Sequence, residues 1–272
     1  DDPIVGLRKQ DIKVQQEHAP SLEFPKTATP TQLYSHGDPS TNAQLMLEMI
    51  NRARADPSAE GIRLATTTDP DVLNAYNYFD VDTSQVITDF AGYPARPPLA
   101  FNSDLIAAAI RHSTDMALND FQEHTGSDGS SMTDRIEAAG YTGWNTIGEN
   151  IYAYSFSVFY GHAGFNVDWG VSELGHRQNI MNYGDTVYNE VGIAIISETD
   201  PSTDVGPLVI TQDFGKRSDY SFLVGVVYCD SDGDGFYGMG EGLAGVTVMP
   251  TSGTYYAITS TSGGYAIPLS AE

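Results

Sequence analysis

The chain has 272 residues, of which 40% are hydrophobic and 11% aromatic. This is enough for one substantial core with a small second unit, and too apolar for a disordered chain. Its 13 basic and 36 acidic residues give a formal net charge of −23, which argues against nucleic acid or an anionic membrane as a partner because both would be repelled. No run of about 18 apolar residues occurs, so no transmembrane segment is expected.

Residues 1–40 contain five prolines and no regular hydrophobic period, which predicts an extended N-terminal arm. The arm's histidines, His18 and His36, are expected to be exposed to solvent rather than to bind a metal. The first helix is predicted to begin at Thr41, whose hydroxyl forms a capping box with the side chain of Gln44. The apolar stripe that follows predicts a helix with one buried face.

Residues 66–98 are polar and aromatic with prolines at the borders, which predicts an insertion between two helices. The second of these helices is predicted over residues 103–119. His112 lies on its apolar face and is expected to be a hydrogen-bonded, partly buried side chain rather than a ligand. A further capping box, Ser131 with Asp134, predicts a short third helix.

The middle of the chain predicts a mixture of strands and one more helix. Residues 146–151 are expected to form a loop that leads into a strand or short turn. Residues 161–172 are expected to form a helix, with His162 packed in its apolar face. Residues 191–196 predict a strand, and residues 208–214 its antiparallel partner.

Two histidines of this central part, His124 and His176, are the best candidates for metal ligands, with Glu149 between them and Glu173 just before His176. Neutral imidazoles and carboxylates suit zinc and other divalent transition metals. Bound zinc lowers the pKa of its water to about 7, and an adjacent Glu149 can then act as general base. Two protein ligands are fewer than the three usual in catalytic zinc sites, which predicts a weakly held ion.

Further along, Asp230, Asp232, Asp234 and Glu241 match the calcium-loop pattern D-x-D-x-D-G-x5-E at every defined position. The aspartates would offer side-chain oxygens to Ca²⁺, Phe236 its backbone carbonyl and Glu241 a bidentate carboxylate. An acidic loop without metal is the less favoured interpretation, because three closely spaced aspartates repel one another unless a cation offsets their charge.

The segments around this loop predict strands rather than the helices of an EF-hand. With its flanks, the loop resembles the calcium-binding B-type repeats of bacterial surface proteins, which are immunoglobulin-like sandwiches. The resemblance implies a small all-β calcium-binding domain over residues 219–272. This stretch is shorter than such a sandwich usually is, so the domain is expected to be minimal or cut short.

The main part of the chain resembles the CAP superfamily of cysteine-rich secretory proteins, antigen 5 and pathogenesis-related proteins. The resemblance covers about two thirds of the chain. Its motifs occur in order and at plausible spacing. They are residues 45–54, 99–105, 111–117, His124-Thr125-Gly126, Gly148-Glu149-Asn150, Gly175-His176-Arg177 and residues 209–214. Eukaryotic members are usually rich in disulfides. The single cysteine here, Cys229, therefore favours the bacterial branch.

The resemblance implies an α+β fold, an α-β-α sandwich over residues 41–218, with a cleft that holds two histidines and two acids. His124 and His176 match the two histidines, and Glu149 matches the acid of the Gly-Glu-Asn motif. Ser172 stands where eukaryotic members have the fourth residue, a glutamate. The set is then either a triad or a tetrad in which Glu173 is the substitute.

Three functions follow from these features. The first is a secreted or cell-surface CAP protein that holds a divalent metal, with zinc the leading candidate, and binds an extracellular ligand or partner in its cleft. The second is a metal-dependent, peptidase-like hydrolase with Glu149 as general base. The third is a structural surface module without catalysis, in which the polar cluster only holds the centre of the fold together.

Overall fold

A four-stranded mixed sheet forms the centre of the molecule in the computed structural model, which describes residues 29–183, 187–217 and 220–269. The strand order is β2-β4-β5-β3. The strands are β2 (Ala100–Phe101), β4 (Glu190–Ser197), β5 (Leu208–Lys216) and β3 (Thr146–Ser155). β5 is antiparallel to both of its neighbours, and β2 is parallel to β4. The predicted hairpin of residues 191–196 with 208–214 is therefore confirmed.

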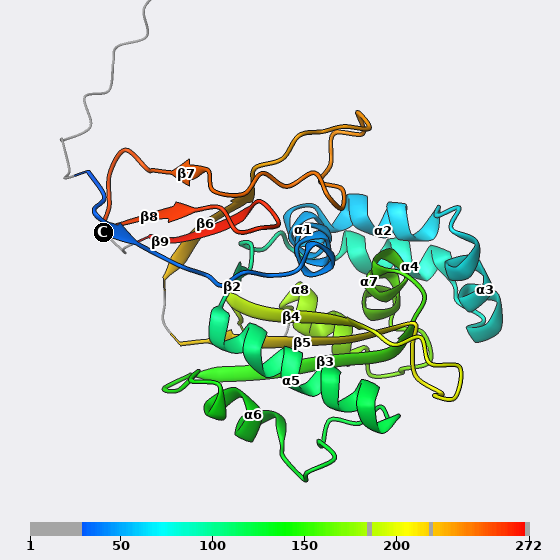
Figure 1. Cartoon of the computed structure of the whole chain (residues 1–272). Coiled ribbons are helices and arrows are strands. Elements are labelled where there is room, and N and C mark those ends of the chain that lie inside the picture. The colour runs from blue at the N-terminus through cyan, green and yellow to red at the C-terminus, as the bar shows by residue number, and fades with distance from the viewer. Residues whose placement is uncertain (1–28, 184–186, 218–219, 270–272) are drawn as a thin grey trace, which may run out of the picture.

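Helices cover both faces of this sheet (Figure 1). One face carries α5 (Ser103–Asn119), with α6 (Met132–Ala138) beside it. The other face carries α1 (Thr41–Ala55), α7 (Val158–Val167) and α8 (Gly175–Met181). The two helical layers and the sheet make the three-layer α+β arrangement that the sequence predicts.

Close packing of α5 on the sheet depends on a glycine in β4. A Cβ built on Gly192 would lie 2.0 Å from the carbonyl carbon of Leu105, so only glycine lets the helix backbone approach this closely. On the other face α1 presents Met46, Ile50 and Ala53, all fully buried. Its N-cap is Ser40, which accepts from the backbone N–H of Ala43, one residue before the predicted cap.

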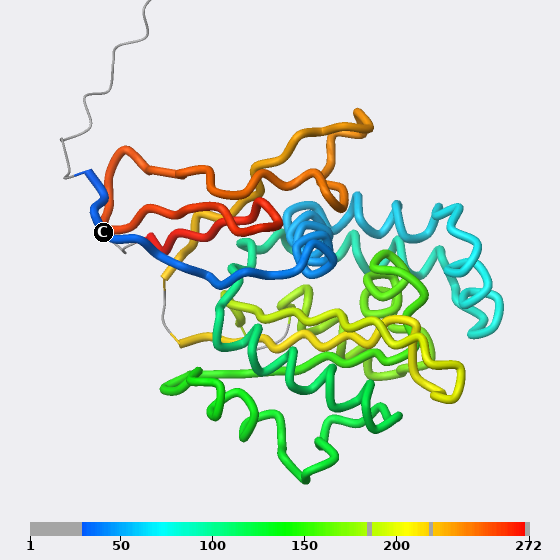
Figure 2. Tube along the Cα trace, in the orientation of Figure 1, coloured from blue at the N-terminus to red at the C-terminus, as the bar shows by residue number. Residues whose placement is uncertain are grey.

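The predicted insertion is helical, and it packs against the end of the sandwich near α7 (Figure 2). It contains α3 (Pro70–Phe79) and α4 (Thr83–Ala91), which follow α2 (Pro57–Ala65). Each of these three helices has an aspartate as its N-cap. α3 ends with Phe79, whose ring stacks on Trp169 at 6.4 Å between centroids. The insertion therefore contributes an aromatic side chain to the sandwich.

Two predicted element boundaries are wrong. Residues 146–151 are not a loop but the first part of strand β3. The helix predicted over residues 161–172 is α7, and it spans Val158–Val167 instead. Ser157 caps its start by accepting from the N–H of Tyr160, and Asp168 ends it in the left-handed conformation with φ of 60°.

The C-terminal part is a small all-β unit. β6 (Ser221–Val226) pairs antiparallel with β9 (Gly264–Leu269), and β7 (Thr247–Val248) pairs antiparallel with β8 (Tyr255–Ile258). The last described part of the N-terminal arm joins this unit, because β1 (Gln32–Leu33) runs parallel to β8 (Figures 1 and 2). Residues Gln32–Leu33 of the arm thus form a strand of the C-terminal sheet, which the sequence does not predict.

The prediction that His36 is exposed is wrong. Its side chain is buried, and its ring stacks on Phe101 at 6.4 Å. The reason is that the arm passes between the β unit and the sandwich: Asp38 accepts from the backbone N–H of Thr261 at 2.8 Å, at the edge of that unit. His18 lies outside the described residues.

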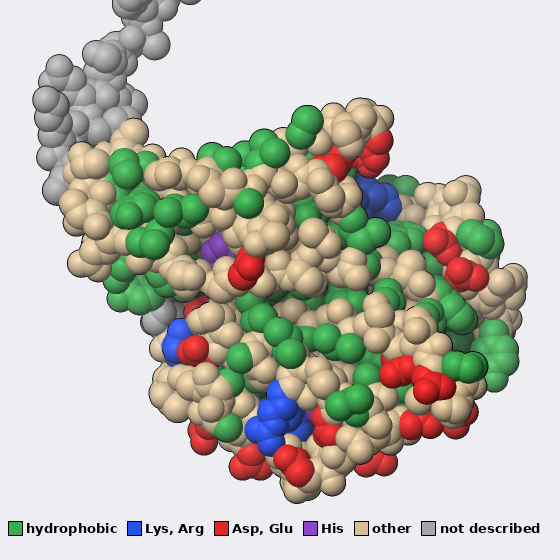
Figure 3. Space-filling model, in the orientation of Figure 1, with side chains coloured by type: hydrophobic (Ala, Val, Ile, Leu, Met, Phe, Trp, Pro, Cys, Tyr) green, Lys and Arg blue, Asp and Glu red, His purple; other side chains and the backbone are tan. Residues whose placement is uncertain are grey.

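The β unit packs on helix α1. The hydroxyl of Ser262 lies 3.3 Å from the side-chain oxygen of Gln44, and the guanidinium of Arg52 lies 4.5 Å from the ring centre of Phe236. Acidic side chains lie along the lower edge of the face seen in Figure 3, in keeping with the formal net charge of −23. Within the described part of the chain, no helix is both long and apolar enough to cross a membrane.

Candidate functional site

Glu149 lies at the centre of the polar cluster, on strand β3. Its side chain is 1% exposed, yet both carboxylate oxygens have partners. One oxygen lies 2.8 Å from Nδ1 of His124, and the other accepts from the guanidinium of Arg135 at 2.6 Å. His112 is 4.0 Å from the same carboxylate. A buried carboxylate is thus paired with one buried cation and aimed at one half-exposed imidazole.

Asp213 faces Glu149 on the neighbouring strand, because the two residues are in register between β5 and β3. Its side chain is fully buried. Burial, and then the negative charge of Glu149, raise the pKa of Asp213 well above its usual range. Burial alone would also raise the pKa of Glu149, but the hydrogen bond with His124 and the charge of Arg135 lower it. Among the described residues neither carboxyl oxygen of Asp213 has a hydrogen-bond partner, so nothing but Arg135 offsets the cost of ionising it beside Glu149.

His176 is held in the same way by a different acid. Its Nδ1 lies 2.6 Å from a carboxylate oxygen of Asp168, and its backbone N–H donates to the other oxygen at 3.0 Å. Asp168 is buried, and its left-handed backbone at the end of α7 points the carboxylate at the start of α8. The sequence prediction placed this residue inside a helix and gave it no role.

Both candidate ligands therefore share one arrangement. In His124 and in His176, Nδ1 is bound to a buried carboxylate, and among the described residues Nε2 has no hydrogen-bond partner. A carboxylate on one ring nitrogen fixes the tautomer and the orientation of an imidazole whose other nitrogen binds a metal. The chemistry of this donor set, two imidazoles each with an unengaged Nε2, suits a divalent transition metal.

The edge strand β3 connects the two halves of this cluster. Successive side chains of a strand point to opposite faces, so Glu149 and Asn150 point to different layers. Glu149 contacts His124 on one side, while the amide of Asn150 donates to the backbone oxygen of His176 at 3.2 Å on the other. Since β3 is the last strand of the sheet, the two histidines approach the same edge from opposite layers.

The part of the chain that contains this cluster matches a known protein family. Residues 47–214, more than half of the chain, match the family model described as the cysteine-rich secretory protein family, CAP. The chain belongs to the CAP family. The matched range starts inside α1 and ends inside β5, so it contains most of the sandwich, with His124, Glu149 and His176.

A solved structure also matches. It is the 1.5 Å crystal structure of an extracellular protein containing an SCP domain from Bacillus anthracis str. Ames, with 23% identity and a TM-score of 0.35. The match covers 55% of this chain and 44% of that one. No curated protein matches.

The other acids and histidines that the sequence highlighted have partners of their own or lie exposed. Ser172 and Glu173 are exposed in the turn before α8, and among the described residues no hydrogen bond or ion pair joins the Glu173 side chain to either histidine. His162 is buried and bonded to Glu60 at 2.9 Å. His112 is buried and bonded to the backbone oxygen of Glu123 at 3.0 Å, as predicted.

An aromatic cavity of about 150 Å³ adjoins His176. Its walls include Phe79, Tyr152, Phe165 and Trp169, together with Asp168, the residue that holds His176. A cavity of about 150 Å³ has room for one benzene-sized group. The insertion therefore completes an apolar pocket directly beside one of the candidate ligands.

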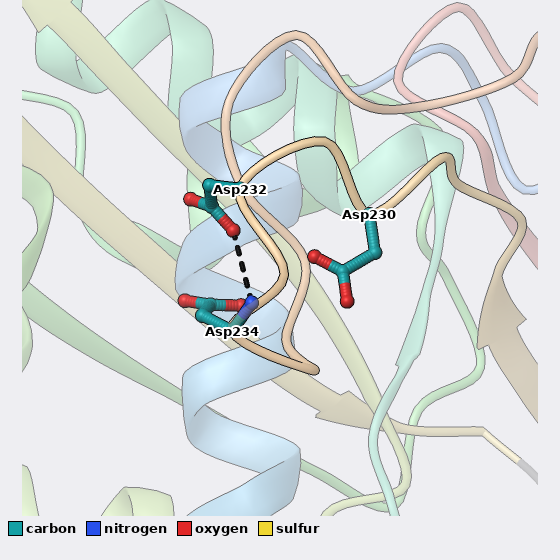
Figure 4. Close-up of side chains that lie close together, drawn as sticks. All are labelled: Asp230, Asp232 and Asp234. Carbon is teal, nitrogen blue, oxygen red and sulfur yellow. Dashed lines mark hydrogen bonds between the residues drawn. The ribbon is translucent and has the colours of Figure 1, made fainter.

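The predicted calcium loop forms a second polar site. Asp230, Asp232 and Asp234 each offer a carboxylate oxygen within 4.8 Å of the others (Figure 4). Ca²⁺ takes oxygens at about 2.3–2.6 Å, so ligands of one ion lie up to about 5 Å apart. The spacing of the three aspartates fits that requirement.

Backbone N–H groups already fold this loop around its acids. Asp230 accepts from the N–H of Gly233 at 2.8 Å and of Gly235 at 3.1 Å. Glu241 accepts from the N–H of Ser231 and of Gly238 at 2.8 and 2.7 Å, which closes the loop. The Glu241 carboxylate is thus bound within the loop, and the three aspartates form the open part of the site.

Proposed function

We propose that this CAP protein acts outside the cell and holds a divalent transition metal, zinc foremost, between Nε2 of His124 and Nε2 of His176. One observation carries the proposal: each imidazole is bound at Nδ1 by a buried carboxylate, Glu149 or Asp168. His162 also bonds to a buried acid, Glu60, but both of its ring nitrogens are engaged, whereas among the described residues Nε2 of His124 and of His176 has no hydrogen-bond partner.

The metal would serve as a Lewis acid that anchors an oxygen or nitrogen of the ligand. The protein supplies two nitrogens, which leaves coordination positions for that ligand. The aromatic cavity beside His176 would take an apolar group of the same molecule. The favoured ligand is accordingly an extracellular molecule, such as a peptide, with a metal-binding group next to an aromatic or branched aliphatic side chain.

Binding is favoured over hydrolysis because of the state of Glu149. Its two oxygens are engaged by His124 and Arg135, and its pKa is lowered. A general base works best with a free oxygen and a pKa near the operating pH. Glu149 therefore suits the task of positioning His124 better than that of accepting a proton from water.

We also propose that the loop around Asp232 binds Ca²⁺, as the spacing of its three aspartates supports. The two sites provide controls for each other. His176→Ala should abolish zinc binding and leave calcium binding intact, whereas Asp232→Asn should weaken calcium binding and leave zinc binding intact.

The experiment is titration calorimetry of each metal into wild type and both variants. Zinc binding by His176→Ala with unchanged affinity would refute the cleft assignment. Calcium binding by Asp232→Asn with unchanged affinity would refute the loop assignment.

A further inference from the structure

Two arginines stand out from the rest of this acidic chain. Within the described residues, six arginines have a carboxylate partner within 4.0 Å: Arg52, Arg63, Arg111, Arg135, Arg177 and Arg217. The other two described arginines, Arg54 and Arg96, have none. In a chain with 36 acidic residues and 13 basic ones, carboxylates are plentiful, so two arginines without one need an explanation.

Both of these arginines line the same cavity. It has a volume of about 340 Å³ and lies where α1, the end of α8 and the first residues of β6 meet. Lys216 lines it as well, and none of the described lining residues is acidic. The cavity shares no described lining residue with the aromatic pocket beside His176.

The two guanidinium groups lie close together, and that of Arg96 has a buried donor without a partner. Arg54 is 1% exposed and donates only to backbone carbonyls, those of Pro97 at 2.9 Å and Ile180 at 2.7 Å. Burial, and then the charge of Arg96, lower the pKa of Arg54 to about 10. Nε of Arg96 is buried and has no hydrogen-bond partner in the described part of the chain. A buried donor without a partner is unfavourable, and an anion would supply the missing acceptor.

The remaining walls are largely apolar. Pro97, Pro98, Tyr188 and Phe222 line the cavity next to the two arginines. A planar guanidinium binds the oxygens of a carboxylate or a phosphate in a bidentate fashion. An inorganic ion has no apolar surface that could pack on these walls, whereas the apolar part of a small organic anion would be buried against them.

We propose that this cavity binds a small organic anion, with its carboxylate or phosphate group on Arg54 and Arg96 and its apolar body against the prolines and aromatic rings. The site lies at the end of α8 opposite His176 and is independent of the metal proposed there.

The test is titration calorimetry with benzoate and phenyl phosphate as probes, and with benzyl alcohol and inorganic phosphate as controls for the two halves of the ligand. At least one aromatic anion should bind wild type with a Kd at or below about 1 mM, a modest affinity of about −4 kcal/mol. The stronger of the two identifies the preferred head group. Each control should bind at least about tenfold more weakly than that anion.

The informative variant is Arg96→Gln, because Arg96 is only partly buried and its backbone hydrogen bond to Arg54 survives the change. Loss of a charge-assisted hydrogen bond should weaken binding about tenfold or more. Arg111→Gln removes the same charge from an exposed ion pair on α5, and this variant should bind the aromatic anion with wild-type affinity. The proposal is overturned if neither aromatic anion binds wild type, if Arg96→Gln binds as wild type does, or if inorganic phosphate binds as tightly as phenyl phosphate.

Discussion

Glu149 and Asp213 face each other across β3 and β5, and their pKa values are moved apart: that of Glu149 is lowered, and that of Asp213 is raised well above its usual range. Two carboxylates this close and this deeply buried cannot both ionise at low cost. The hydrogen bond with His124 and the positive charge of Arg135 lower the pKa of Glu149, whereas burial and the charge of Glu149 raise that of Asp213.

Asp213→Asn should make the protein more stable relative to wild type as the pH rises. The folded-state pKa of Asp213 lies above its unfolded value of about 3.9, so folded wild type binds the extra proton, and its stability falls as the pH rises through that window. Asparagine has nearly the same shape and stays neutral at every pH. The gain should reach up to about 1.4 kcal/mol for each pH unit in the window.

Urea unfolding of both proteins at pH 5 and pH 8 measures this difference. Asp71→Asn, at an exposed position on α3, makes the same chemical change on the surface and serves as the control. A stability difference between Asp213→Asn and wild type that is the same at both pH values would show that Asp213 is ionised in the folded protein.

Asp168→Asn should weaken zinc binding without removing a ligand. The substitution leaves the shape of the side chain but takes away the negative charge that fixes Nδ1 of His176. Changes to such supporting residues typically cost about 10–100-fold in metal affinity. Zinc titration should show this loss, with calcium affinity of the same sample unchanged. Wild-type zinc affinity in Asp168→Asn would mean that Asp168 does not support a metal ligand.

Calcium should stabilise the protein through the aspartate loop. At a free concentration about a hundred times the Kd, binding contributes about 2.7 kcal/mol, which for a chain of this size raises the Tm by about 5–10 °C. Because Phe236 of the loop packs on Arg52 of α1, part of this effect should reach the sandwich. Thermal unfolding with calcium and with chelator tests it. Asp232→Asn should lose most of the shift, and an unchanged shift would place the calcium elsewhere.

His36 should make the protein sensitive to acid. Burial lowers its pKa to about 4, so the folded protein resists protonation of a ring that accepts a proton near pH 6.5 when unfolded. The contribution of His36 to the free energy of unfolding is fully present above pH 6.5, and it falls by about 3 kcal/mol as the pH drops to 4. His36→Phe keeps an aromatic ring on Phe101 and should flatten this part of the profile. An equally steep loss in the variant would assign the acid sensitivity to other groups.

Short local motifs mark His124, Glu149 and His176 in the sequence, and the structure places His124 beside Glu149 and the backbone of His176 beside Asn150. The supporting acids are missed for physical reasons. Asp168 acts through the left-handed end of α7, and the predicted helix ran past that end to residue 172. Asp213 acts through its register with Glu149, and strand pairing over this distance leaves no local signal.

The same limit applies to the N-terminal arm. Prolines and the lack of a hydrophobic period predict an extended chain, and the described part of the arm is extended. Nothing near His36 in the sequence, however, shows that β1 pairs with β8, more than 200 residues away. Burial of His36 follows from that pairing and from its contact with Phe101, so it could not be predicted from local pattern.

The most direct test of the cleft is a crystal structure of the protein soaked with zinc, with diffraction data collected on both sides of the zinc absorption edge. The account predicts an anomalous peak at about 2.0–2.1 Å from Nε2 of both His124 and His176. Asp168 and Glu149 should remain on the Nδ1 atoms. A crystal with full zinc occupancy elsewhere and no peak between these two imidazoles would contradict it.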